Sequence, residues 1–169
     1  MSSTRLKVLI VNQSPTFRYN LMVMLGNRNY QFFQASTGRH AIESARVNQP
    51  QLIVMDNRLG DMDGIECLRQ IRNIGAFGGT RIIMLRREIL RDDLFMPEQQ
   101  TDFTREAHRL GCSDFVSIPV SPTALLRKVD KLEHYIRISA PEMPPLPNIA
   151  PTSLTSPPII AGPASGIFK

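Results

Sequence analysis

The sequence predicts an α/β fold in which five strands alternate with five helices and pair in parallel in one doubly wound sheet. Two observations carry this prediction. Short apolar runs recur between segments whose apolar residues have helical spacing, and three of these runs are apolar throughout. Such runs are typical of strands that are buried on both faces of a parallel sheet. Right-handed crossovers then place the functional crevice beyond the carboxyl ends of the strands.

The elements follow one another along the chain in the order that this fold requires. Strands are predicted at 8–11, 31–35, 52–55, 82–85 and 115–118. The run at 31–35 is the least apolar, so we place it nearer an edge of the sheet. The first helix, at 17–25, follows Ser14 and Pro15, which suit an N-cap and a proline in the first turn. The other helices are predicted around 41–45, 65–71, 103–110 and 125–132, with Gly111 ending the fourth.

Composition divides the 169 residues into one domain and a tail. With 42% hydrophobic and 21% charged residues, the chain is neither fibrous nor wholly disordered. From 139 to 169 there are eight prolines, and the only charged residues are Glu142 and Lys169. We therefore predict a domain at 1–138 and a disordered, proline-rich tail at 139–169, which serves as a tether or a docking peptide. No membrane span or leader peptide is indicated, which favours a cytoplasmic location.

Several other classes of site find little support in the sequence. Cys67 and Cys112 form no CxxC pair and are interpreted as reduced, partly buried thiols. The histidines are interpreted as solvated helix residues outside any triad or metal site: His40, His108 and His134. The net charge of +5 is spread along the chain, so nucleic-acid binding is a weak alternative.

Three segments together resemble the receiver domain of bacterial two-component response regulators. They are residues 8–14, the apolar strand at 50–56 that ends in Asp56, and a helix opened by Gly64 eight residues later. The resemblance covers roughly residues 6–136. It implies a flavodoxin-like (βα)5 fold and places Asp56 at the position of the aspartate that accepts a phosphoryl group with magnesium bound.

The resemblance also implies an acidic pair after the first strand, which supplies carboxylate ligands to Mg²⁺. This sequence has Asn12 and Gln13 there. An amide oxygen can coordinate magnesium but contributes no net charge. We therefore expect magnesium binding to be weak or absent and predict no metal or other cofactor.

Three further positions depart from the pattern that the resemblance implies. Arg86 stands where receivers have a Ser or Thr that contacts the phosphoryl group. Phe115 stands at the aromatic switch position and has no hydroxyl group. Receivers have a lysine directly before a proline at the end of the fifth strand. Here Ile118 takes the place of that lysine before Pro119. The residues of the degenerate pocket are thus Asn12, Gln13, Arg86, Phe115, Ile118 and Pro119.

Two interpretations of Arg86 stay open. In the first, its guanidinium group forms a permanent ion pair with Asp56, which takes the place of the regulated metal and phosphoryl site. In the second, Arg86 points to solvent. A segment at about 87–101 is longer than receivers need and is interpreted as an insertion, which either packs on the domain or presents a partner surface.

The loop after Asp56 carries acidic residues that could suggest another metal. Asp61 and Asp63 miss the spacing of a calcium loop and are interpreted as turn and cap residues before the third helix. The glycines within 75–79 precede a strand, so they indicate a helix-to-strand connection rather than a phosphate-binding loop.

Together these observations predict a degenerate receiver, or pseudo-receiver, that is not an enzyme and binds a protein partner independently of phosphorylation. By the resemblance, the binding face comprises the fourth helix, the fifth strand and the fifth helix, assisted by the insertion or the tail, with a homodimer left open. The alternative is an atypical phosphoacceptor in a phosphorelay, in which Asp56 accepts the group, Asn12 and Gln13 still coordinate Mg²⁺ and Arg86 neutralises the transferred group.

Overall fold

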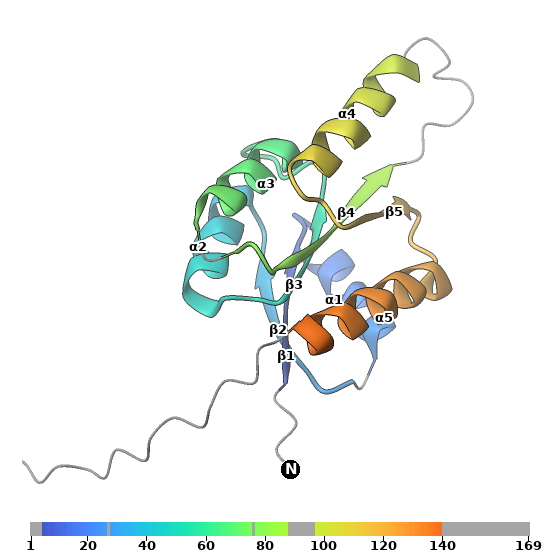
Figure 1. The fold of residues 1–169 in the computed structure, drawn as a ribbon. Coiled ribbons are helices and arrows are strands. Elements are labelled where there is room, and N and C mark those ends of the chain that lie inside the picture. The colour runs from blue at the N-terminus through green and yellow to red at the C-terminus, as the bar shows by residue number, and fades with distance from the viewer. Residues whose placement is uncertain (1–4, 27, 76, 88–96, 140–169) are drawn as a thin grey trace, which may run out of the picture.

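A computed structural model describes residues 5–26, 28–75, 77–87 and 97–139. Five parallel strands form one sheet in the order β2-β1-β3-β4-β5 (Figure 1). The strands are β1 (Leu6–Val11), β2 (Tyr30–Ala35), β3 (Leu52–Asp56), β4 (Arg81–Arg87) and β5 (Asp114–Ile118). The helices are α1 (Pro15–Leu25), α2 (Gly38–Asn48), α3 (Gly64–Asn73), α4 (Pro97–Arg109) and α5 (Pro122–Ser139).

This arrangement confirms the predicted flavodoxin-like fold. The predicted strand at 31–35 is the edge strand β2, as expected from its lower apolar content. Helix α4 begins at Pro97, so the end of the predicted insertion belongs to this helix. Most of that insertion, and the predicted tail after Ser139, lie outside the described residues.

The helices cover both faces of the sheet. Along β1, for example, Leu9 and Val11 join the core under α2, α3 and α4, whereas Val8 and Ile10 join the core under α1 and α5. Because successive side chains of a strand point to opposite faces, a strand with helices on both sides must be apolar at every position. The burial of β1, β3 and β4 explains the continuous apolar runs from which these strands were predicted.

Side-chain caps fix where the helices begin. Ser14 is the N-cap of α1 and accepts a hydrogen bond from the Phe17 amide, as predicted. Asp63 is the N-cap of α3, which confirms its predicted role. Asp61 lies in the bend before α3, as predicted. Its carboxylate also accepts hydrogen bonds from Gly38 N at 2.7 Å and Arg39 N at 2.9 Å, a contact with the start of α2 that the sequence did not predict.

Both cysteines are buried, Cys67 completely and Cys112 to 5% exposure. Burial raises the pKa of the Cys67 thiol to about 12 and that of Cys112 to about 11. At neutral pH both are therefore protonated and unreactive. The helices of the described ranges lack the length and apolar character that crossing a bilayer requires.

Candidate functional site

Asp56 ends the central strand β3 and is the best-enclosed carboxylate at the carboxyl end of the sheet, with 5% of the residue exposed. Its Oδ2 accepts a 2.7 Å hydrogen bond from Nδ2 of Asn12. Its Oδ1 accepts a 3.2 Å hydrogen bond from the backbone amide of Arg58. Both carboxylate oxygens therefore have a donor from the protein itself.

Asn12 is held in place by its own contacts. It lies directly after β1 and is 7% exposed. Its Oδ1 accepts a 2.8 Å hydrogen bond from the amide of Ser14, which turns Nδ2 toward Asp56. The guanidinium group of Arg18, on the first turns of α1, donates to the carbonyl oxygen of Asn12 at 2.6 Å. The loop that carries Asn12 is thus anchored from both sides.

Gln13 is exposed, and its side chain lies on the loop after β3 instead of on Asp56. Its Nε2 donates to the carbonyl oxygen of Arg58 at 3.4 Å, and its amide group packs beside Gly60. Gly60 has φ +79°, a conformation that residues with a Cβ rarely adopt. The two amides that replace the predicted acidic pair therefore have separate roles, and only Asn12 touches Asp56.

The pKa of Asp56 lies above its ordinary value. Burial raises it, because removal of water disfavours the charged form. The hydrogen bond from the Arg58 amide and the positive charge of Arg87 oppose this effect without cancelling it. The carboxylate is thus stabilised mainly by neutral donors and by arginine charges nearby.

The predicted ion pair between Arg86 and Asp56 was wrong. Asp56 pairs with Leu85 in the ladder between β3 and β4, so their side chains lie on the same face of the sheet. The side chain of the next residue of β4, Arg86, therefore lies on the opposite face. Arg86 follows this alternation, and its guanidinium carbon lies 5.9 Å from the ring centroid of Phe115. The alternative in which Arg86 points to solvent was also wrong, since its Nε is buried and has no hydrogen-bond partner among the described residues.

Two arginines that sequence reasoning missed lie at the site instead. Arg87 has the same parity as Leu85 and therefore belongs to the face of Asp56, where its charge lowers the carboxyl pKa. Strand alternation separates Arg87 from Arg86 only once the register between β3 and β4 is known. Arg18 donates to the carbonyl oxygens of both Asn12 and Gln13. Nothing in the sequence singled it out, because this contact depends on how α1 packs on the loop.

Phe115, on β5, is partly buried and in contact with three side chains. The ring centroids of Phe103 and His108 lie 6.2 Å and 5.0 Å from that of Phe115, both edge to face, and the guanidinium carbon of Arg86 lies 5.9 Å from it. His108 is exposed, as expected for a helix histidine, but it also serves this contact. Ile118 packs in the core under α1 and α5, and its peptide bond to Pro119 is cis.

Comparison with known proteins decides the family. The response regulator receiver domain matches residues 8–130. The chain belongs to this family. Protein PilH of Pseudomonas aeruginosa is 26% identical over 124 residues, 73% of this chain and 94% of PilH. Chemotaxis protein CheY of Bacillus subtilis is 26% identical over 126 residues, 74% of this chain and 95% of CheY. The structure of the chemotaxis response regulator CheY4 of Vibrio cholerae gives a TM-score of 0.65 at 26% identity and covers 76% of this chain and 99% of CheY4.

The protein is therefore a receiver domain of bacterial two-component and chemotaxis-type signalling.

For such a domain the question is whether the residues present could hold Mg²⁺. Mg²⁺ prefers octahedral oxygen ligands and needs carboxylates for charge. In the described ranges, no three His, Cys, Asp or Glu side chains gather in a way that could hold a metal ion. The other side-chain oxygen beside Asp56, Oδ1 of Asn12, is engaged by Ser14. These residues do not fit magnesium.

Proposed function

We propose that this receiver domain is a pseudo-receiver, which acts as a protein-protein interaction module in the bacterial cytoplasm without regulated phosphorylation. The hydrogen bond from Asn12 to Asp56 carries the proposal. It supplies Asp56 with a neutral donor at the position where the resemblance implies an acidic metal ligand. The carboxylate is thereby satisfied without a bound cation.

Electrostatics supports the same conclusion. Around the single carboxylate of Asp56, Arg18 anchors the preceding loop and both Arg58 and Arg87 lower the carboxyl pKa through their charge. Among the described side chains that contact Asp56 or shift its pKa, a divalent cation entering this site would meet one negative charge and several positive ones. Repulsion between like charges in a partly buried site disfavours such binding.

The route by which phosphorylation would alter the surface is also missing. Arg86 occupies the position of the hydroxyl switch and rests on Phe115. Phe115 is in turn fixed by Phe103 and His108 and carries no hydroxyl group that could change partners. We expect this cluster to keep the surface of α4 and β5 in one arrangement.

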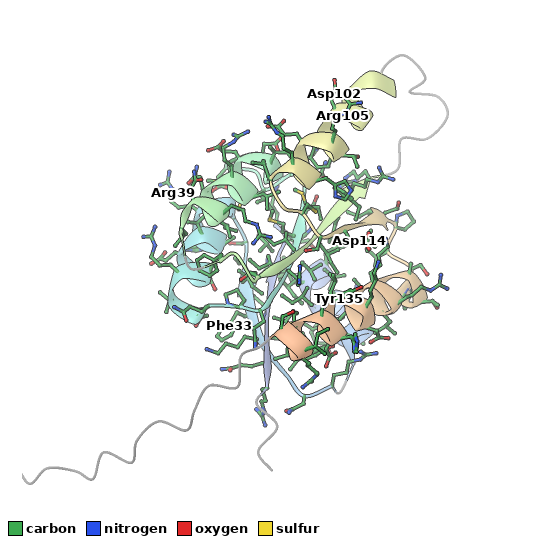
Figure 2. All side chains as sticks on the ribbon, viewed as in Figure 1. Phe33, Arg39, Asp102, Arg105, Asp114 and Tyr135 are labelled. Atoms are coloured by element: carbon green, nitrogen blue, oxygen red, sulfur yellow. The ribbon has the colours of Figure 1, made fainter. Side chains whose placement is uncertain are left out.

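The proposed docking face comprises α4, β5 and α5. It is continuous because β5 is the edge strand next to α5, and α4 follows the adjacent strand β4 (Figure 1). An ion pair between Asp114 and Lys128 joins β5 to α5. Asp102 and Arg105 form an exposed pair on α4 (Figure 2). This mixture of charges suits a protein partner, including a second copy of the chain, better than a polyanionic nucleic acid.

The test is incubation with acetyl phosphate and MgCl₂ followed by intact-mass measurement. We expect no phosphoryl adduct on the native chain. A positive control restores the implied pocket with Asn12→Asp, Gln13→Asp, Arg86→Thr and Ile118→Lys, and should gain one phosphoryl group that Asp56→Asn removes. An adduct on the native chain that disappears with Asp56→Asn would overturn the proposal.

A second candidate function is supported by the arginines beside Asp56. In an atypical phosphoacceptor, the carboxylate would attack the donor phosphorus, acetate would leave with the bonding electrons, and an acyl phosphate would form on Asp56. Arg58 and Arg87 would then balance the negative charge of the phosphoryl group. The same experiment distinguishes the two functions, because this candidate requires an adduct that is reduced by Arg87→Ala.

A further inference from the structure

The proposed function leaves unused a cavity of about 310 Å³ at the other end of the sheet. It lies where β3 and β4 begin, whereas Asp56 lies where β3 ends. Its walls come from the connection before β3, the connection before β4 and the last turn of α5. The wall residues used below are Pro50, Phe77, Arg81, Ile136 and Ser139.

The cavity combines an apolar floor with a cation. Phe77 is 2% exposed and Ile136 is 8% exposed, so their side chains form a fixed apolar surface. The guanidinium carbon of Arg81 lies 5.9 Å from the ring centroid of Tyr135, and its Nε is buried without a hydrogen-bond partner among the described residues. A buried donor without a partner is unfavourable, so an acceptor that reached it would stabilise the fold.

Tyr135 extends this surface outward. It is 43% exposed on α5 (Figure 2), next to the wall residue Ile136. An exposed aromatic ring beside an arginine resembles the surfaces that bind extended proline-rich segments, since prolines pack on aromatic rings with little loss of conformational entropy.

The chain itself supplies a segment with matching chemistry. The described residues end at Ser139, which is part of the cavity wall. The sequence that follows is rich in proline and apolar residues, and its single acidic residue is Glu142. Three residues of extended chain span about 10 Å, so Glu142 is within reach of the cavity.

We infer that residues 140–149 fold back into this cavity. The carboxylate of Glu142 pairs with Arg81, and Pro144, Pro145 and Leu146 cover Tyr135 and Phe77. The short connection gives the segment a high local concentration, so modest contacts suffice to keep it bound. This contact lies at the opposite end of the sheet from Asp56 and does not depend on the state of that site.

The test is ¹⁵N relaxation of the full-length chain. Bound residues should have backbone order parameters above ~0.6, and unbound residues values below this. We expect Glu142, Met143 and Leu146 to be in the ordered range. Glu142→Lys lies outside the described domain, so it tests the contact without disturbing the core, and should bring all three residues below the threshold.

A charge exchange tests the partner of Glu142. Arg81→Glu should release the segment, and Arg81→Glu combined with Glu142→Arg should restore its order. Arg46→Glu makes the same charge change at an exposed position of α2 and is the matched control. Order parameters below ~0.6 in the native chain would overturn the inference. So would order that is lost on dilution, which would identify the tail of a second copy as the occupant.

Discussion

The side-chain amide of Asn12 donates a 2.7 Å hydrogen bond to the carboxylate of Asp56. The sheet register brings the two residues together. Val11 pairs with Met55 in the parallel ladder between β1 and β3, so the next residue of each strand, Asn12 and Asp56, leaves the sheet side by side. A donor at position 12 therefore satisfies Asp56, whereas an acid at position 12 would repel it.

Asn12→Asp should consequently destabilise the domain. Two carboxylates within hydrogen-bond distance cannot both ionise freely, and the lost donor leaves a buried oxygen unsatisfied. We expect a loss of about 1–3 kcal/mol in the free energy of unfolding at neutral pH, measured by urea denaturation. Added MgCl₂ should recover part of this loss in the variant and change nothing in the native protein.

The control for this variant is Asn20→Asp. Asn20 is exposed on α1, so the same substitution there should alter stability by less than about 0.5 kcal/mol. If Asn12→Asp is as stable as the native protein at neutral pH without magnesium, the Asn12–Asp56 hydrogen bond does not contribute as described.

The sheet could be predicted from the sequence because β1, β3 and β4 are covered on both faces. Burial on both faces forces apolar residues at every position, and Val54 and Ile83 are among the many that are completely buried. The start of α1 was predictable for a different reason, since Ser14 and Pro15 act within one helical turn of each other. Local chemistry and continuous burial both leave direct traces in a sequence.

The direction of individual side chains at the site could not be predicted in the same way. Whether Arg86 or Arg87 faces Asp56 depends on the register between β3 and β4, a shift of one residue that exchanges the two faces. The hydrogen bonds of Asp61 to the start of α2 could not be predicted either, because tertiary packing brings its loop to Gly38. The sequence identifies which residues line the pocket, but which of them contact one another depends on the three-dimensional structure.

The position of Arg86 leads to a second prediction, on thermodynamic coupling. Because no ion pair joins Arg86 to Asp56, the variants Arg86→Ala and Asp56→Ala should have additive effects within about 0.5 kcal/mol. Arg86→Ala and Phe115→Leu should instead be coupled by about 0.5–1 kcal/mol, since the guanidinium group rests on the ring. Urea denaturation of both double-mutant cycles measures the two coupling energies. Coupling between Arg86 and Asp56 in the first cycle would show that the two residues form an ion pair after all.

Gly64 offers a third prediction, on packing beside Asp56. A Cβ at this position would lie 2.8 Å from the Cα of Asn57 and 2.9 Å from the carbonyl oxygen of Asp56. Because backbone atoms cannot move aside easily, Gly64→Ala should destabilise the domain by about 1–3 kcal/mol in urea denaturation. At Gly78 a Cβ would meet nothing within 4 Å, so Gly78→Ala is the matched control and should be nearly neutral. Equal stability of the two variants would contradict the close approach of α3 to the end of β3.

The last prediction concerns the contact of α5 with the edge strand β2. The hydroxyl group of Tyr30 donates a 2.6 Å hydrogen bond to Oε2 of Glu133. Burial raises the pKa of Tyr30 to about 12, so the hydroxyl group keeps its proton throughout the neutral range. Burial also acts to raise the pKa of Glu133, but hydrogen bonds from Tyr30 and Arg137 outweigh it, and the net effect is a lowered pKa.

A carboxyl group whose pKa is lowered on folding stabilises the fold above its unfolded pKa, about 4.3, and loses this contribution as the pH falls through the folded value. Tyr30→Phe should therefore cost about 1.5 kcal/mol at pH 7, as expected for a hydrogen bond to a charged group, and distinctly less in acid. Urea denaturation across the acid range measures this dependence. Tyr19→Phe, at a residue that is 64% exposed, should have no effect at any pH. A cost for Tyr30→Phe that stays constant with pH would show that the hydroxyl group stabilises the fold independently of the ionisation of Glu133.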